Sequence, residues 1–271
     1  MDVLCIFPLS NNYEKLKDII DCFIREIAVN LAPPCTNVHI ITPNPDYQYV
    51  GVGDIVPISK PKGQFIIDAI KSSSPQIDYV LMCDGSGAIP YKYTIDIFQA
   101  LISDPKIHCA MIERIGQNKA ISKERFLIEK FEVFSLKKFF GYAEDIPDGQ
   151  GGLWGFYRRE IEKNGIKNKI NLTAKEYDIE LDLLSEVLEK NFGFLFVPIT
   201  LPKREIISAF TYENNIRKMI FLLDKHPMLS NKLKSFLDEY LIQAKQEIDT
   251  LDENGKIIWE KYKKDVLTLL K

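Results

Sequence analysis

A single carboxylate followed by two glycines and a hydroxyl ends an apolar run in the stretch LMCDGSGAIP, residues 81–90. Asp84 is the carboxylate, and Ser86 stands two positions after it. A carboxylate can hold Mg²⁺ or Mn²⁺ together with the oxygens of a diphosphate, because hard cations prefer oxygen ligands. The same Asp-Gly-Ser-Gly sequence is also a good turn, in which glycine supplies positive φ and Asp and Ser bond to nearby backbone. Taken alone it favours the turn, so a binding site here depends on other segments.

A second stretch, DGQGGLWGFYRRE over residues 148–160, has residue types that suit a sugar or phosphate ligand. Asp148 and Gln150 offer an acceptor and an amide for hydroxyl groups. Trp154 offers a flat apolar face of the kind on which sugars stack, and Arg158 offers a cation for phosphate, although an arginine in a helix more often points to solvent. The glycines at 149, 151 and 152 allow the backbone to come close to a ligand or to another strand.

These stretches need a framework, and the chain alternates short apolar runs with amphipathic helical segments. Strands are predicted at Val3–Pro8, Asn37–Thr42, Asp54–Ile58, Tyr79–Cys83, His108–Ile112 and Phe194–Val197, and helices at 12–30, 63–71, 93–102 and 179–190. Strands that are apolar throughout and alternate with helices predict a mainly parallel α/β sheet covered on both faces. Ligands bind beyond the carboxyl ends of such strands, which is where Asp84, Glu113 and Arg114 fall.

The end of the chain has only helical periodicity. We therefore expect an α/β domain over residues 1–210 and a helical C-terminal extension over residues 211–271, with Asn254-Gly255 interrupting the last helical segment. The charges of these helices are mixed, which suits packing on the core or forming a homo-oligomer.

Composition excludes several classes of protein. A formal charge of -3 over 271 residues argues against a nucleic-acid binder, which needs a basic surplus. The five cysteines are odd in number and show no C-x-x-C spacing, which favours reduced thiols and a cytoplasmic location. No apolar run approaches the ~20 residues that cross a bilayer. No glycine-rich phosphate loop follows a strand, which disfavours a nucleotidyltransferase and a dinucleotide-dependent dehydrogenase.

Five segments in the same order resemble the GT-A-fold glycosyltransferases of family 2, most closely the polyprenyl-phosphate (dolichol-phosphate) mannosyltransferase branch. The resemblance runs from about residue 3 to residue 208. Its segments are IFPLSNNYEKL, PKGQFIIDAI, DYVLMCDGSGAIP, DGQGGLWGFYRRE and EYDIELDLLSEVLEKNFGFLFVPITLPKRE.

The resemblance implies an inverting transfer of a sugar from a nucleotide-sugar donor by direct displacement. It assigns the donor to Pro8, Asn11, Lys62, Gly63, Asp84 and Ser86, the acceptor to Arg114, Arg125, Trp154 and Arg158, and catalysis to Asp84, Asp148 and Gln150. The acceptor is a polyprenyl phosphate, reached at a membrane surface on the cytoplasmic side, or a soluble hydroxyl compound. A phosphate is already an anion, whereas a hydroxyl acceptor would need Asp148 as its base.

The sequence departs from the family at the metal site, where Ser86 replaces the second aspartate of the D-x-D motif. Three hypotheses follow. Asp84 holds Mg²⁺ or Mn²⁺ with the diphosphate and waters completing the shell, weakly unless a carboxylate such as Asp148 joins it. Or basic side chains replace the metal, with Lys62, Arg114 or Arg125 neutralising the charge. Or the chain is a non-catalytic relative that binds a sugar nucleotide or a lipid phosphate.

Some charged residues also have a plain structural interpretation. Glu124, Glu129 and Glu132 alternate with the cations after residue 114, as on a solvated helix face. Glu180 is expected to face solvent or to cap a loop. His108, in an apolar strand, is expected to be a buried histidine with satisfied hydrogen bonds.

Overall fold

The computed structural model describes residues 1–8, 25–27, 29–31, 37–41, 61–83, 89–90, 92–115, 121–158, 170–201 and 212–270. Within these ranges a six-stranded sheet has the order β2-β1-β3-β5-β4-β6. The strands are β1 (Asp2–Ile6), β2 (Asn37–Ile41), β3 (Tyr79–Met82), β4 (Cys109–Ile115), β5 (Trp154–Tyr157) and β6 (Phe194–Thr200).

The sheet is mainly parallel with one antiparallel strand near its centre. β1 pairs in parallel with β2 and β3, and β4 pairs in parallel with β6, whereas β5 runs antiparallel to both β3 and β4. The predicted α/β class with a mainly parallel sheet is confirmed. Because β5 is inverted, its amino end lies at the edge where β3 and β4 have their carboxyl ends.

Side chains of successive strand residues enter two separate cores, as the period of two requires. In β3, Tyr79 and Leu81 face the core covered by α3 (Lys92–Ser103), while Val80 and Met82 face the other core. That second core is covered by α2 (Lys62–Ser72) and α6 (Ile179–Glu189). Burial on both faces explains why the strand sequences are apolar throughout.

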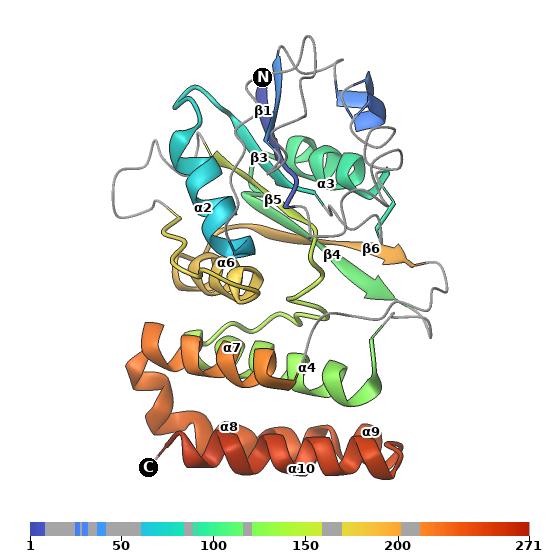
Figure 1. The fold of residues 1–271 in the computed structure, drawn as a ribbon, viewed down its shortest axis with the longest axis vertical. Helices are drawn as coiled ribbons and strands as arrows, with labels where there is room; N and C mark the ends of the chain where they lie inside the picture. Colours follow the sequence, from blue (N-terminus) through green and yellow to red (C-terminus); the bar gives the residue numbers. More distant parts are fainter. Residues whose placement is uncertain are drawn as a thin grey trace.

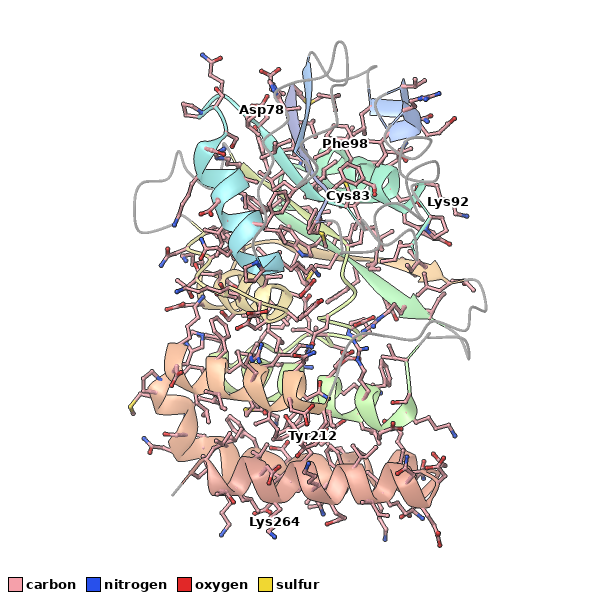
Figure 2. All side chains as sticks on the ribbon, viewed as in Figure 1. Asp78, Cys83, Lys92, Phe98, Tyr212 and Lys264 are labelled. Atoms are coloured by element: carbon pink, nitrogen blue, oxygen red, sulfur yellow. The ribbon has the colours of Figure 1, made fainter. Side chains whose placement is uncertain are left out.

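Beyond α6 the helices form two further tiers (Figure 1). The first tier holds α4 (Lys123–Phe140) and α7 (Tyr212–Lys225). The second holds α8 (Ser230–Gln243), α9 (Lys245–Asp249) and α10 (Glu253–Thr268), which follow the short 3₁₀ helix η2 (Pro227–Leu229). Tyr212 lies between the two tiers (Figure 2), where its hydroxyl donates to Oδ2 of Asp265 at 2.7 Å.

Helix α4 is buried from two sides. Leu127, Ile128 and Phe131 pack with the C-terminal helices, while Val133 and Leu136 pack with side chains of α6 and α7. A helix sandwiched in this way has no single apolar stripe, because almost every face meets protein. Glu129 and Glu132 lie in this buried surface, exposed by 3% and 0%. The interpretation of these glutamates as a solvated face is therefore wrong.

Two other expectations differ from the structure. No strand was expected for the WGFY run at residues 154–157, which forms β5, and Gly155 is needed there because a Cβ would lie 2.6 Å from Cδ2 of Leu81. Asn254 and Gly255 lie in the first turn of α10, whose N-cap Asp252 accepts from the amide of Gly255, so the helical interruption comes just before them. The strand predicted at Asp54–Ile58 lies outside the described residues.

Candidate functional site

Backbone pairing brings the two candidate segments to one edge of the sheet. Met82, two residues before Asp84, pairs with Trp154 of β5, and Met111 of β4 pairs with the same residue from the other side. The amide of Ile112 donates to the carbonyl of Leu153 at 3.1 Å. In Figure 2 the label of Cys83 marks the end of β3 within this edge. Asp84, Ser86 and Asn11 themselves lie outside the described residues.

At this edge Asp148 is held by Arg114, which lies near the end of β4. Oδ2 of Asp148 accepts from the backbone amide of Arg114 at 3.0 Å and from its Nε at 2.6 Å. Oδ1 accepts from Nη2 of Arg114 at 2.8 Å and from the amide of Gln150 at 3.2 Å. Four bonds occupy the four lone-pair positions of a carboxylate. Asp148 is therefore a fixed anchor, with no acceptor position left for a substrate proton or a metal ion.

The guanidinium of Arg114 connects this anchor to α4. Its Nη2 also donates to Oε2 of Glu129 at 2.9 Å, while Nε of Arg125 donates to Oε1 of the same glutamate at 2.9 Å. Burial alone would raise the pKa of Glu129, but the charges of Lys218, Arg114 and Arg125 outweigh it and lower that pKa to about 2. Burial likewise opposes the charge of Arg114, and the charges of Asp148 and Glu129 raise its pKa above the ordinary value.

Gln150 is held on both ends of its side chain. Its Nε2 donates to Oε2 of Glu132 at 2.6 Å, and its Oε1 accepts from Nζ of Lys218 on α7. Tyr262 of α10 donates its hydroxyl to Oε1 of Glu132 at 3.4 Å. Burial raises the pKa of Glu132 to about 7, and the charge of Lys218 offsets only part of that rise. The three buried carboxylates of Asp148, Glu129 and Glu132 thus share one network with cations from β4, α4 and α7.

A pocket of about 870 Å³ opens beside this network. Glu113 and Arg114 from the end of β4 line it, together with the face of α4 that carries Lys130, Lys137 and Lys138. Each of these lysines pairs with a carboxylate at the surface: Glu247, Asp145 and Glu239, respectively. The walls also include Phe126, Phe134, Tyr142 and Tyr240. Cationic and aromatic side chains together suit a ligand that carries both an anionic group and apolar or sugar surface.

Of the residues predicted to bind the donor, the structure describes Pro8, Lys62 and Gly63. Pro8 is half-buried just after β1. Lys62 begins α2 and pairs with Glu180 of α6, whose side chain is buried, so the expectation that Glu180 faces solvent is wrong. Gly63 is required for packing, since a Cβ would lie 2.4 Å from the carbonyl oxygen of Ala174.

Two predicted acceptor residues lie away from the pocket. Trp154 is fully buried in β5, within the core covered by α2 and α6, so its ring offers no open face for a sugar. Arg158 follows β5 at the opposite edge of the sheet, where its Nη1 donates to Oγ of Ser73 at 2.6 Å and to the carbonyl of Ser74 at 3.3 Å. Both side chains are held by other parts of the protein.

The glycines of the acceptor segment approach other protein elements. A Cβ on Gly149 would lie 2.7 Å from Cγ2 of Val133, and one on Gly151 would lie 2.4 Å from Cγ1 of Ile112. Gly152 has φ of 76° and open space around it. Gly149 and Gly151 are therefore needed because the backbone comes close to other elements of the protein. Gly152 is favoured because its backbone is left-handed.

Within the described ranges no group of three or more His, Cys, Asp or Glu side chains is arranged to hold a metal ion. Asp148 was the carboxylate considered as a partner for Asp84 at a metal, and its bonds to Arg114 remove it from that role. No helix in the described part of the chain is long and apolar enough to cross a membrane.

Sequence reasoning missed Glu129, Glu132 and Lys218 as parts of this site. Lys218 belongs to the C-terminal helices, beyond the reach of the family resemblance. The spacing of Glu129 and Glu132 does place them on one side of α4, next to Ile128, Phe131 and other apolar residues. Acidic residues flanked so closely by large apolar side chains could have indicated that these glutamates are buried.

No protein-family model and no curated protein matches this sequence. Solved structures do match its fold. Glucosyl-3-phosphoglycerate synthase from Mycobacterium tuberculosis, in complex with uridine diphosphate, is 13% identical and aligns over 82% of this chain and 79% of its own with a TM-score of 0.52. Mannosyl-3-phosphoglycerate synthase from Rubrobacter xylanophilus is also 13% identical, over 84% and 75%, with a TM-score of 0.54. The chain thus has the GT-A-like fold of nucleotide-sugar transferases.

Proposed function

We propose that this protein is a glycosyltransferase that moves a sugar from a nucleotide-sugar donor to a phosphate-bearing acceptor, with polyprenyl phosphate as the first candidate. The observation that carries the proposal is the meeting of the strand that leads to Asp84 with the Asp148–Leu153 segment at one edge of a GT-A-like sheet. In open α/β sheets this carboxyl edge is where ligands bind.

The bonding of Asp148 favours a phosphate over a hydroxyl as the acceptor. A hydroxyl must lose its proton as it attacks, and the carboxylate assigned to that task has its lone pairs occupied by Arg114 and Gln150. A phosphate needs no base at neutral pH. It needs cations, and the pocket beside Arg114 is lined by three lysines of α4.

The proposed reaction is a single displacement. An acceptor phosphate oxygen forms the new bond to the anomeric carbon, the bond from that carbon to the donor diphosphate breaks, and the electron pair leaves with the nucleoside diphosphate. We assign Arg114 and Arg125 to the acceptor side. Lys62, Gly63, Pro8 and Asn11 belong to the donor side, and Asp84 with Ser86 to the leaving diphosphate.

A divalent cation, Mg²⁺ or Mn²⁺, would neutralise charge on the leaving diphosphate when bound near Asp84. Replacement of the metal by side chains finds less support. Lys62 is paired with Glu180, and Arg114 with Asp148 and Glu129, so both cations already neutralise buried carboxylates.

Titration calorimetry with UDP- and GDP-sugars, with and without Mn²⁺, combined with a transfer assay, tests this proposal. The acceptor panel holds polyprenyl phosphates and, because two proteins of similar fold are named for it, 3-phosphoglycerate. We expect donor binding that strengthens with Mn²⁺ and turnover that collapses in Asp84→Ala. Turnover that survives in Asp84→Ala would remove Asp84 from the mechanism.

The internal pairing of Arg114 and Lys62 also fits a second candidate, a non-catalytic relative that binds a sugar nucleotide or a lipid phosphate. Tight donor binding with neither hydrolysis nor transfer to any acceptor would favour that candidate.

A further inference from the structure

The C-terminal helices reach into the site through one side chain. Lys218 lies in the middle of α7 and is 3% exposed. Its Nζ donates to Oε1 of Gln150 and lies 3.6 Å from Oε1 of Glu129. A lysine is rarely buried unless it is paired, so a buried ammonium with two partners on different elements indicates a specific role.

Lys218 fixes the orientation of the Gln150 carboxamide. A lysine ammonium can only donate hydrogen bonds, so its partner on the carboxamide must be the oxygen Oε1. The nitrogen Nε2 then points to Oε2 of Glu132, which accepts its hydrogen bond. Reversing the amide would bring the donor Nε2 against the ammonium, which is also a donor.

The same ammonium also supports Arg114 indirectly. Glu129 lies between Lys218 and Arg114, and it remains ionised in its buried position because Lys218, Arg114 and Arg125 surround it. An ionised Glu129 holds Nη2 of Arg114, and Arg114 in turn holds both oxygens of Asp148. One side chain of α7 thereby supports both Asp148 and Gln150.

We propose that Lys218 is a positioning residue of the transferase, through which the C-terminal helices set the geometry of the acceptor side. This role rests on the proposed function. It requires no contact between Lys218 and the substrate. Without the ammonium, we expect Gln150 to lose its fixed orientation and Arg114 to lose part of its support, whereas donor binding at the ends of β1 and β3 should persist.

The test compares Lys218→Met with Lys225→Met. Lys225 lies two turns further along α7 and is also paired with buried carboxylates, Asp182 and Glu186. Lys225→Met therefore also removes a cation from buried carboxylates, but away from Gln150. Donor affinity is measured by calorimetry with UDP- and GDP-sugars. Acceptor kcat and KM are measured with farnesyl phosphate, a short isoprenoid phosphate.

We expect Lys218→Met to lower kcat/KM for the acceptor about 100-fold, the scale of a small misplacement of reacting groups, with donor Kd within about twofold of wild type. Lys225→Met should keep the acceptor kcat/KM of wild type. Lys218→Arg should recover part of the loss, because a guanidinium can still donate to both Gln150 and Glu129.

The other possible results distinguish failure of the positioning role from failure of the proposed function. If Lys218→Met fails to fold, the double variant Lys218→Met/Glu132→Gln takes its place. It is compared with Glu132→Gln alone, because Glu132 also bonds Gln150, and it should show the larger acceptor defect. Acceptor kcat/KM equal to that of Lys225→Met, or an equal loss of donor and acceptor binding, overturns the positioning role alone. A wild-type protein that binds donor and transfers nothing overturns the proposed function and this role with it.

Discussion

At the scale of single residues, the structure shows protein partners for two residues that were predicted to bind a ligand. Asp148 and Gln150 were predicted to meet hydroxyl groups of a ligand, and each instead has its polar atoms committed to protein partners. The partners of Gln150 were unpredictable, because Glu132 and Lys218 come from helices whose packing no local pattern specifies.

Glu132 makes the stability of the protein depend on pH. Its folded-state pKa of about 7 lies above the ordinary value of 4.5, so the folded protein binds this proton more tightly than the unfolded chain does. Its contribution to the free energy of unfolding is fully present below about pH 4.5 and is lost as the pH rises to about 7. Glutamine cannot titrate, so Glu132→Gln removes this loss.

We therefore expect the free energy of unfolding of Glu132→Gln, relative to wild type, to rise between pH 5 and pH 7 by at most about 1.4 kcal/mol per pH unit and to level off above. Urea unfolding at a series of pH values measures this difference. Glu247→Gln is the control for replacing a glutamate outside the buried network, since that side chain is 51% exposed. A flat or falling difference for Glu132→Gln would contradict the assigned titration.

At the scale of elements, strands were easier to predict than their arrangement. The runs at Tyr79–Cys83 and Asn37–Thr42 differ from β3 and β2 by a single residue, because a short apolar run bounded by polar residues is a strong local signal. β5 was missed because four residues after a glycine cluster carry little periodicity, and only pairing with β3 and β4 shows that they form a strand. The same inversion of β5 is what places Asp148 beside the end of β4.

Adjacent glycines ahead of β5 should respond differently to substitution. Gly151→Ala places a Cβ against the side chain and the carbonyl of Ile112, at 2.4 and 2.7 Å, so we expect a loss of about 3 kcal/mol in the free energy of unfolding, the upper end of the range for overpacking. Gly152→Ala meets open space and costs only the left-handed backbone conformation, about 1 kcal/mol. Urea unfolding of the two variants measures both losses, and equal values would contradict this account of the segment.

At the scale of the whole molecule, side chains on the two sides of the boundary predicted near residue 210 pack against each other. Leu127, Ile128 and Phe131 of α4 share a core with Trp259 and Tyr262 of α10, while the other side of α4 packs toward α6. The helical nature of the extension was evident in the sequence. Its contribution to the buried charge network was hidden, since Lys218 meets Glu129 across a long separation in the chain.

A chain that ends at residue 210 should therefore fail to form a stable fold. Removing α7 to α10 would expose the apolar surface of α4 to water and would remove Lys218 from Gln150 and Glu129. We expect binding of a hydrophobic dye and no cooperative thermal transition, measured by fluorescence and circular dichroism. A chain ending at residue 268, the end of α10, is the control. A soluble 1–210 fragment with cooperative unfolding would show that the extension is dispensable.

Two-sided burial of α4 has an evolutionary consequence. Recombination of genes can add or remove a domain without loss of stability only where few residues on either side of the junction contact each other. Here a replacement of the C-terminal helices would also have had to supply a basic residue beside Glu129 and Glu132 of α4. We accordingly expect homologous sequences to retain the sheet together with both tiers of helices. Lysine or arginine should occupy position 218 wherever acidic residues occupy positions 129 and 132.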